Sequence, residues 1–355
     1  MEFKCPDQGI GACSLPTMAT SNSDRLPTIV DVAREAGVSM KTVSRVINND
    51  PTVKPKNLEK VQQAIAKTGY RRNAFARGLR ARQSLMIGLL YEQAEGEYPA
   101  NILAGALAAC RERGYHLMVE VVKGDSMLNS ARDFLLQMNF DGVILTPPVC
   151  DNPDVIGFLN ENDIRYVRIS PLNSLPLGHE IGIDDEQAGH ALVEHLITLG
   201  HRKIAHILGD EGHRATIQRL AGYRRAHDEA GLSFPEGYVV GGGFSSEAGF
   251  EGARKLLALD DPPTAIFASN DECAAGVLAC AQAYGVRVPD ELSVVGFDGS
   301  IIADLVHPTL TTMVQPTQAM AAEAVRMIVD ARESTERKTL PIEMRVSKST
   351  AACRT

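Results

Sequence analysis

The sequence predicts a small all-α head that contains a helix-turn-helix, followed by an α/β body of two doubly wound parallel-sheet lobes. Three observations support this fold class. Apolar residues recur at helical spacing in three short segments between residues 28 and 69. From Leu85 onward, short apolar runs alternate with amphipathic helical windows, which is typical of parallel sheets covered by helices on both faces. The same alternation restarts after Gly182-Ile-Asp184, and this predicts a second, similar lobe.

Composition limits the class of protein. The chain has 355 residues, 44% of them hydrophobic and 23% charged, as expected for a soluble globular protein of more than one domain. We find no apolar run of membrane-spanning length and no secretory signal in residues 1–24. The seven cysteines are scattered without metal-ligand or redox spacing. We therefore expect free thiols, a cytoplasmic location and no membrane partner.

Charge divides the chain into a basic and an acidic part. The net charge is −8, yet residues 25–82 hold thirteen Lys or Arg against four Asp or Glu, a local charge of +9. Residues 83–355 carry −15. A basic head is drawn to phosphates while an acidic body is not, so this asymmetry favours a nucleic-acid partner. A merely solvated basic surface is the alternative.

The head is predicted to begin with two helices that meet at a tight corner. Thr28 can cap the first helix, with Asp31 returning the hydrogen bond, and Gly37 can end it in a left-handed conformation. Ser39 can cap a second helix that runs from Met40 to about Asn48.

A third helix is predicted over residues 57–67, ending before Gly69. Apolar residues of the three helices are expected to face inward, with Val38 filling the corner. They are Ile29, Val32, Ala33, Ala36, Val43, Val46, Ile47, Leu58, Val61, Ala64 and Ile65.

The outer side of the second helix carries the chemistry expected of a DNA-reading helix. A short helix with an exposed first turn fits the major groove. Arg45 could bind the two acceptors of a guanine, Lys41 could reach a base or phosphate, and Met40 could contact a thymine methyl group. An ordinary three-helix packing unit with solvated side chains is the alternative.

The run from Thr28 to Asn48, TIVDVAREAGVSMKTVSRVIN, resembles the head of the LacI/GalR, or lactose-repressor, family of bacterial transcriptional regulators. The resemblance implies that Met40, Lys41 and Arg45 read bases. It also implies capping or DNA-backbone contacts for a second group of residues. These are Thr28, Ser39, Thr42, Ser44 and Asn48.

The segment from Tyr70 to Arg80 is similar to the hinge of this family, in which a short helix folds on operator DNA and a leucine enters the minor groove. Arg72 stands where a proline is usual, and Gly78 lies inside the expected hinge helix. The resemblance implies operator contacts for four residues. These are Asn73, Ala76, Arg77 and Leu79.

Alternating elements are expected along the body. In the first lobe, strands 86–90, 117–122 and 142–146 precede helices 100–113, 126–138 and 152–162. In the second lobe, the expected helices are 186–199, 215–230, 246–258 and 271–284, and the strands are 203–208, 237–240, 264–268 and 292–296.

Polar residues follow several of these strands, at the sheet edge where open parallel sheets bind ligands. Arg219, Asn270 and Asp298 together suit a hydroxyl-rich ligand, and Phe244 offers an apolar wall. Each has a structural alternative: Arg219 as an ion-pair donor, Asp298 as a turn residue, and the neighbouring Asp271 as a helix cap.

The family resemblance continues through the body, for example at Ser269-Asn-Asp271 and Ser293-Val-Val-Gly-Phe-Asp298. It implies a fold like that of periplasmic binding proteins and an assembly of homodimers or tetramers. No heptad leucine pattern follows Val346, so a coiled-coil tetramer is not expected. The resemblance also implies a set of effector-binding residues. They are Tyr91, His213, Arg219, Phe244, Asn270, Asp298 and Gln315.

These observations predict four regions: a flexible arm at 1–25, the helix-turn-helix domain at 26–72, a hinge helix and linker at 73–84, and the two-lobed effector-binding and dimerisation domain at 85–355. Lobe one is expected at about 85–184 and 316–340. Lobe two is expected at about 185–315 and 341–355.

The predicted function is that of a transcriptional repressor whose affinity for double-stranded operator DNA is controlled by a sugar-like effector. A purine or another non-sugar corepressor is the alternative. A solute-binding protein would need an export signal and no head. A nucleotide-dependent enzyme would need a phosphate-binding glycine motif or a nucleophile elbow, which we do not find. No cofactor is expected. We expect no metal site, because the candidate histidines are spread over separate elements. They are His179, His190, His195, His201 and His206.

Overall fold

The computed structural model describes residues 27–47, 50–70, 84–92, 96–330 and 335–354. The chain divides into two compact units, residues 1–74 and 75–355. No helix in these ranges is long and apolar enough to span a membrane.

The first unit is a three-helix domain made of α1 (Ile29–Ala36), α2 (Met40–Ile47) and α3 (Pro55–Thr68). The predicted caps form. The Asp31 carboxylate accepts hydrogen bonds from the backbone N–H and the hydroxyl of Thr28, at 2.8 and 2.7 Å. Gly37 ends α1 with a φ of +63°, and the Ser39 hydroxyl accepts the Thr42 N–H at 3.2 Å. These local contacts fix the corner between α1 and α2.

The core of this domain lies between the three helices around Val32, Val43 and Val61, which are fully buried. The third helix begins two residues before the predicted start, because Pro55 is well suited to the first turn of a helix. The prediction that Leu58 faces inward is wrong: its side chain is 38% exposed, and the buried face of α3 is formed by Val61 and Ala64.

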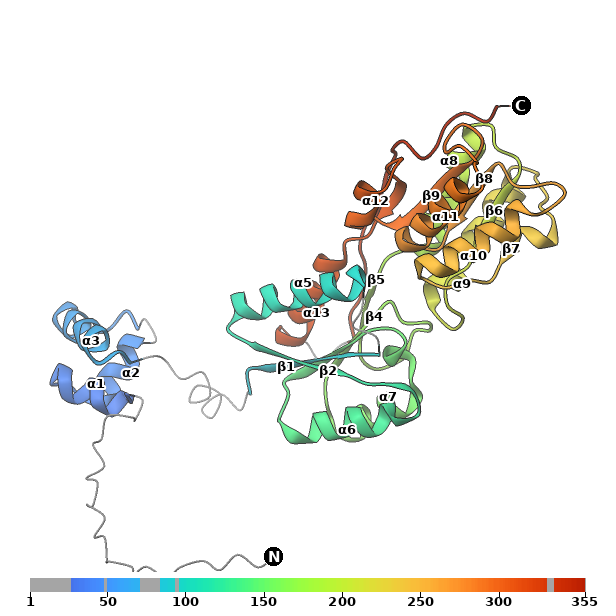
Figure 1. The fold of residues 1–355 in the computed structure, drawn as a ribbon. Coiled ribbons are helices and arrows are strands. Elements are labelled where there is room, and N and C mark those ends of the chain that lie inside the picture. The colour runs from blue at the N-terminus through green and yellow to red at the C-terminus, as the bar shows by residue number, and fades with distance from the viewer. Residues whose placement is uncertain (1–26, 48–49, 71–83, 93–95, 331–334, 355) are drawn as a thin grey trace, which may run out of the picture. The chain divides into compact units, whose positions relative to one another are not determined.

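Lobe one of the second unit is built on a six-stranded sheet in the order β11-β5-β4-β3-β1-β2, in which all neighbours are parallel. Helix α5 packs against α13 on this sheet, and α6 packs against α7 (Figure 1). The strands are β1 (Met86–Tyr91), β2 (His116–Val121), β3 (Gly142–Leu145), β4 (Tyr166–Ile169), β5 (His179–Gly182) and β11 (Arg337–Thr339). The helices are α5 (Glu97–Arg113), α6 (Met127–Gln137), α7 (Pro153–Glu161) and α13 (Thr317–Val329).

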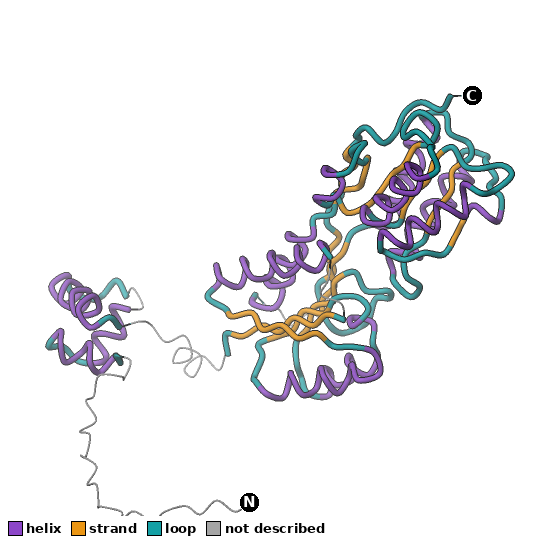
Figure 2. The backbone as a smooth tube through the Cα atoms, viewed as in Figure 1, coloured by secondary structure: helices purple, strands orange, loops and turns teal. Residues whose placement is uncertain are grey.

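Lobe two again combines helices with a central set of strands (Figure 2). Its sheet has the order β12-β10-β9-β8-β6-β7. Its strands are β6 (Ile204–Ile207), β7 (Val239–Val240), β8 (Ala265–Ala268), β9 (Ser293–Asp298), β10 (Thr311–Val314) and β12 (Glu343–Arg345). Its helices are α8 (Asp185–Thr198), α9 (Arg214–Glu229), α10 (Ser246–Leu257), α11 (Asp271–Ala283) and α12 (Ile301–Leu305). The edge strand β12 pairs antiparallel with β10, which departs from the all-parallel prediction.

The chain passes between the lobes after β5, after β10 and after β11, so each sheet includes strands from distant parts of the sequence. The predicted strand at 237–240 is shorter than expected, because residues 236–238 form a 3-10 turn before β7.

Glycines allow neighbouring helices of lobe two to approach closely. A Cβ on Gly222 of α9 would lie 2.1 Å from the Glu186 carbonyl oxygen of α8. A Cβ on Gly276 of α11 would lie 1.9 Å from the Ser246 carbonyl oxygen of α10. Both distances are far below van der Waals contact, so larger residues would force these helix pairs apart.

Candidate ligand cleft and nucleic-acid interface

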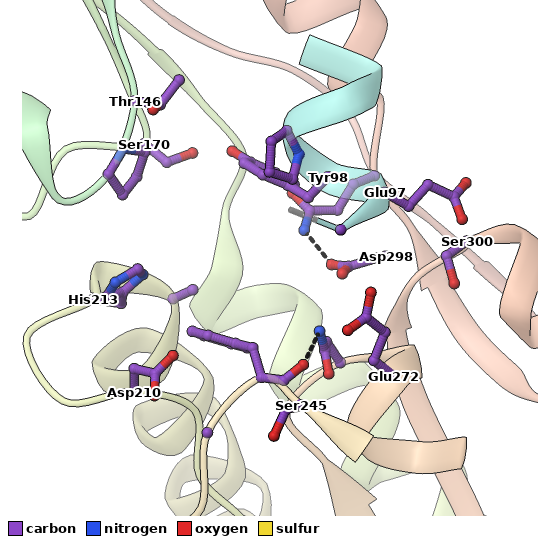
Figure 3. A pocket seen from close by; sticks show the side chains of 18 of the residues that line it. Glu97, Tyr98, Thr146, Ser170, Asp210, His213, Ser245, Glu272, Asp298 and Ser300 are labelled. Carbon is purple, nitrogen blue, oxygen red and sulfur yellow. Dashed lines mark hydrogen bonds between the residues drawn. The ribbon is translucent and has the colours of Figure 1, made fainter. Parts of the chain in front are cut away.

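A cavity of about 450 Å³ lies between the two lobes of the second unit (Figure 3). Lobe one contributes residues that follow β1, β3 and β4, and lobe two contributes residues at the starts of α8, α9, α10 and α11. The cavity size is typical of small-ligand sites. All of the effector-binding residues that the sequence predicts line it: Tyr91, His213, Arg219, Phe244, Asn270, Asp298 and Gln315.

Arg219 lies in the wall of this cavity and is held by a buried ion pair. Its Nε and Nη2 lie 3.1 and 3.0 Å from Oδ1 of Asp185, and both side chains are less than 5% exposed. Nη1 donates to the Ser269 carbonyl oxygen at 2.7 Å, and the guanidinium lies over the Phe297 ring at 3.4 Å from its centre. Arg219 is therefore both an ion-pair donor, as the structural alternative predicts, and a residue of the cavity wall.

Asn270 is the N-cap of α11 and also holds the loop that carries Phe244. Its Oδ1 accepts the Cys273 N–H at 2.8 Å, and its Nδ2 donates to the Phe244 carbonyl oxygen at 3.0 Å. The interpretation of Asp271 as the helix cap is wrong, because Asn270 occupies that position.

Asp271 is buried beneath the cavity wall. Its carboxylate accepts the Ser300 N–H at 2.7 Å and the Thr312 hydroxyl at 2.6 Å. Burial raises the pKa of Asp271 to about 6, although these two donors oppose the shift. The residue thus ties α11 to the segment after β9 and to β10.

Asp298 ends β9 with a φ of +111°, a conformation that non-glycine residues rarely adopt. Its Oδ1 accepts a hydrogen bond from Nε2 of Gln315 at 2.6 Å (Figure 3). Burial raises the pKa of Asp298 to about 7, with the positive charge of Arg219 acting in the opposite direction. Unusual backbone geometry that surrounding contacts hold in place is common at binding sites.

Aromatic groups form the apolar part of the cavity. The rings of His213 and Phe244 lie 5.5 Å apart and are tilted by 54°. From lobe one, the Tyr91 hydroxyl donates to the Pro99 carbonyl oxygen at 3.0 Å, and burial raises its pKa. Tyr98 lines the cavity from the first turn of α5, and burial raises its pKa also. These rings give a ligand an apolar face beside the polar groups.

Sequence reasoning missed several residues that line the cavity. Thr146 and Ser170 directly follow β3 and β4. Thr146 ends the predicted strand 142–146, so the rule about strand ends could have found it. No such signal marks most of the others, which belong to helix starts or loops. They are Glu97, Tyr98, Asp185, Asp210, Arg214, Ser245, Glu272 and Ser300.

Among the residues that the structure describes, two hydrogen bonds join the lobes beside the cavity. Oε2 of Glu97 in lobe one accepts the backbone N–H of Ile301 in lobe two at 2.8 Å. Nη1 of Arg214 in lobe two donates to the Pro171 carbonyl oxygen of lobe one at 3.2 Å. Few direct contacts of this kind suit lobes that change their relative orientation when a ligand binds.

The predicted DNA-reading residues lie on the outer side of α2 in the first unit. Met40 is 54% exposed, and Lys41 and Arg45 are exposed as well. The Arg45 Nε lies 2.8 Å from Oδ2 of Asp50, and its Nη2 also contacts the Thr52 hydroxyl. The Arg45 guanidinium holds the pKa of Asp50 well below its usual range.

The remaining predicted DNA contacts fall into two groups. Thr28, Thr42 and Ser44 are half-buried, and the Ser39 and Thr42 hydroxyls lie 2.9 Å apart. Thus Thr28, Ser39 and Thr42 take part in the local hydrogen bonds of the corner. The other group lies outside the described residues: Asn48, Asn73, Ala76, Arg77 and Leu79.

Comparison with known proteins agrees with both parts of the structure. Residues 28–73 match the model of bacterial regulatory proteins of the lacI family, and residues 193–350 match a periplasmic binding protein-like domain. Catabolite control protein A of Priestia megaterium is 34% identical over 318 residues, which cover 85% of this chain and 91% of that protein. The chain belongs to the lacI family. It is therefore a DNA-binding transcriptional regulator rather than an enzyme, and the fold class predicted from the sequence is confirmed.

Other members of the lacI family extend this comparison. The ribose operon repressor of Escherichia coli strain K12 is 32% identical over 310 residues, covering 86% of this chain and 92% of that protein. A solved complex of the transcriptional regulator CelR with cellobiose superimposes with a TM-score of 0.71 at 31% identity, covering 91% of this chain and 99% of that one. The lac repressor dimer bound to operator and the anti-inducer ONPF gives a TM-score of 0.79 at 27% identity, covering 92% and 100%.

Proposed function

We propose that this lacI-family member is a cytoplasmic, homodimeric repressor whose operator affinity is controlled by an uncharged, sugar-like effector in the cleft between the lobes. The single observation that carries the sugar assignment is the composition of the cavity: carboxylate, amide and guanidinium groups surround an aromatic wall. Hydroxyl groups both donate and accept hydrogen bonds, so they suit such a mixture of partners. The similar CelR has been solved with cellobiose, which supports this choice.

Charge in the cavity argues against an anionic effector. Two arginines line it, and one of them, Arg219, is already paired with Asp185. Charges of one sign in a confined site of low dielectric repel a ligand of the same sign. A phosphorylated sugar or a carboxylate is therefore disfavoured. Five carboxyl groups line the same space: Glu97, Asp185, Asp210, Glu272 and Asp298. Burial raises the pKa of Asp298 to about 7 and also raises the pKa of Glu272, so these two groups are less fully ionised at neutral pH.

The aromatic pair favours a sugar ring over a purine. A flat base stacks on an aromatic face, and two rings can both stack on it only if they are nearly parallel. The 54° tilt between His213 and Phe244 forms a corner instead, which fits the C–H face of a saturated ring. A purine corepressor stays the second candidate, because Phe244 alone offers one stacking face.

Control of DNA binding is proposed to follow from closure of the lobes. A ligand that contacts both lobes stabilises one relative orientation, and its effect on operator affinity equals its difference in affinity for the two orientations. Couplings of about 1–3 kcal/mol are typical. We also propose that the chain divides into arm, head, hinge and two lobes. In the hinge, four residues are proposed to contact the operator: Asn73, Ala76, Arg77 and Leu79.

The test is a binding panel on the full-length protein. Thermal shift and calorimetry compare glucose, ribose and cellobiose with glucose 6-phosphate, hypoxanthine and guanine. We expect at least one neutral sugar to bind and the phosphorylated sugar to fail. Binding by purines alone would replace the sugar assignment with the purine alternative.

Asp298→Ala identifies the site of binding. It removes the carboxylate that Gln315 holds at the cavity, so the sugar hit should weaken at least tenfold. Asp304→Ala is the matched control, because this aspartate is exposed outside the cavity and pairs with Arg345. Full binding by the Asp298 variant would contradict the proposed place of the ligand.

A further inference from the structure

Asp141 lies at the start of lobe one's central strands, just before β3, and its side chain is buried. Its two carboxylate oxygens accept two successive backbone N–H groups. Oδ1 accepts the N–H of Ser84 at 2.9 Å, and Oδ2 accepts the N–H of Leu85 at 2.8 Å. One buried carboxylate thus holds the two residues that precede β1.

Further hydrogen bonds complete this arrangement. The Ser84 hydroxyl accepts the Met86 N–H at 3.2 Å, and the backbone N–H of Asp141 donates to the Met86 carbonyl oxygen at 2.9 Å. The Leu85 carbonyl oxygen accepts the His116 N–H at 2.8 Å. Every backbone N–H from Ser84 to Met86 therefore has an acceptor inside lobe one.

Leu85 adopts a backbone conformation that its side chain disfavours. Its φ is +59°, in the left-handed region, and its side chain is 3% exposed within the core of the body. A residue with a Cβ keeps such a conformation where surrounding contacts enforce it. Asp141 supplies this constraint through the Leu85 N–H.

The position of these contacts in the chain gives them a functional meaning. The match to the lacI family's DNA-binding model ends at residue 73, so the chain that comes from that unit reaches β1 through Ser84 and Leu85. Strand β1 begins at this point and ends at Tyr91 in the cavity wall. The entry point and the cavity thus lie at opposite ends of one strand of six residues.

We propose that Asp141 is a positioning residue for operator binding, because its carboxylate fixes the place and direction in which the linker leaves lobe one. Without this anchor, Ser84 and Leu85 gain conformational freedom, and the connection to the DNA-binding unit becomes effectively longer. DNA binding must then order these residues again. Ordering about one backbone residue corresponds to about a tenfold loss of affinity.

The test uses the full-length protein and a duplex that the wild-type protein selects from a randomised DNA pool. Asp141→Asn keeps the shape of the side chain but replaces one acceptor oxygen with an NH₂ donor. Asn152→Ala is the matched control: the Asn152 Oδ1 also accepts two backbone N–H groups in lobe one, those of Asp154 and Val155 at 3.0 Å each, at the start of α7.

We expect the dissociation constant of the selected duplex to rise about tenfold for Asp141→Asn and less than twofold for Asn152→Ala, at similar thermal stability. Amide hydrogen exchange at Ser84 and Leu85 should accelerate only in the first variant. If Asp141→Asn fails to fold, Ser84→Pro tests the contact with the carboxylate intact, because it lacks the N–H that Oδ1 accepts, and it should also weaken binding of the selected duplex. Ser84→Ala is its control, because both variants lose the hydroxyl that accepts the Met86 N–H.

Two results would overturn the proposal: unchanged DNA affinity in an Asp141→Asn protein whose exchange at Ser84 and Leu85 is faster, or an equal loss of DNA affinity in Asn152→Ala. The second result would assign Asp141 to the stability of lobe one alone. Failure of the wild-type protein to select any duplex would instead count against the DNA-binding role, so the two failures can be told apart.

Discussion

Removal of the Asp185 carboxylate should be among the most damaging single substitutions in the cavity wall. Asp185→Ala leaves the Arg219 guanidinium, which is 4% exposed, without its carboxylate partner. At 3.0 Å and an effective dielectric constant of about 20, the lost attraction between the two charges is about 5.5 kcal/mol. The Ser269 carbonyl oxygen and the Phe297 ring contact Arg219 in both proteins, so they do not replace this term. We expect a loss of about 3–5 kcal/mol in the free energy of unfolding.

Urea denaturation of the full-length protein measures this loss. The control is Asp304→Ala, which breaks an ion pair whose aspartate is 61% exposed and should cost at most about 1 kcal/mol. A second variant, Asp185→Ala with Arg219→Met, removes both charges and keeps much of the apolar volume. It should recover most of the stability, because no unpaired charge stays buried.

The reasoning fails if Asp185→Ala costs no more than the Asp304 control. It also fails if the double variant is as unstable as the single one, since the penalty would then come from lost packing and not from an uncompensated guanidinium.

Three further substitutions test other parts of the structure. Burial raises the pKa of Asp298 to about 7, so the folded protein holds the proton on this carboxyl group more tightly than the unfolded chain does. The protonated carboxyl group therefore contributes to the free energy of unfolding below about pH 4, and this contribution is lost as the pH rises through about 7. Asp298→Asn should therefore flatten the decline of unfolding free energy between about pH 4 and 8, and an unchanged slope in urea titrations would contradict the shift. Gly276→Ala places a Cβ 1.9 Å from the Ser246 carbonyl oxygen and should destabilise the protein by about 1–3 kcal/mol in the same assay; a neutral effect would show that α10 and α11 can separate freely. Arg45→Ala should weaken binding of the selected duplex by about 1–3 kcal/mol and relax the preference at one base pair, whereas a uniform loss over all base pairs would indicate a phosphate contact.

The head could be predicted from the sequence because its signals are local. Thr28 and Asp31 are three residues apart and meet within one turn, and Gly37 needs no distant partner to end α1. Leu58 shows where this reasoning stops. Its position in the helical pattern is apolar, but its exposure depends on how α3 lies against the other two helices, which periodicity does not specify.

Strand β4 could not be predicted from an apolar pattern, because Arg168 lies in it. The Arg168 side chain is 2% exposed and pairs with Asp151 at 2.7 Å and Glu180 at 3.2 Å, while its Nε donates to the Cys150 carbonyl oxygen at 2.6 Å. These partners come from two separate places in the sequence, Cys150-Asp151 and Glu180. A charge inside a strand indicates a surface position until such partners are known.

In the cavity, the family resemblance located residues on the lobe-two loops more completely than those of lobe one. Asn270 and Asp298 follow recognisable strands, so their positions can be read from the chain. Glu97 and Glu272 lie near helix starts in different lobes and approach only because the lobes meet. Burial raises the pKa of Glu272, and the neighbouring Glu97 carboxylate raises it further. The second effect depends on how the two lobes are placed relative to each other.

The structure also separates roles that the sequence treats as alternatives. Both polar groups of Asn270 already have partners, the Cys273 N–H and the Phe244 carbonyl oxygen, so its replacement by alanine removes a helix cap worth about 1 kcal/mol together with any ligand contact. Asp298 is different. Gln315 occupies one of its oxygens, and no donor among the described residues hydrogen-bonds to the other. Its carboxylate therefore has an acceptor available for a hydroxyl group, and substitutions at Asp298 should separate effector recognition from folding more cleanly than substitutions at Asn270 or Arg219.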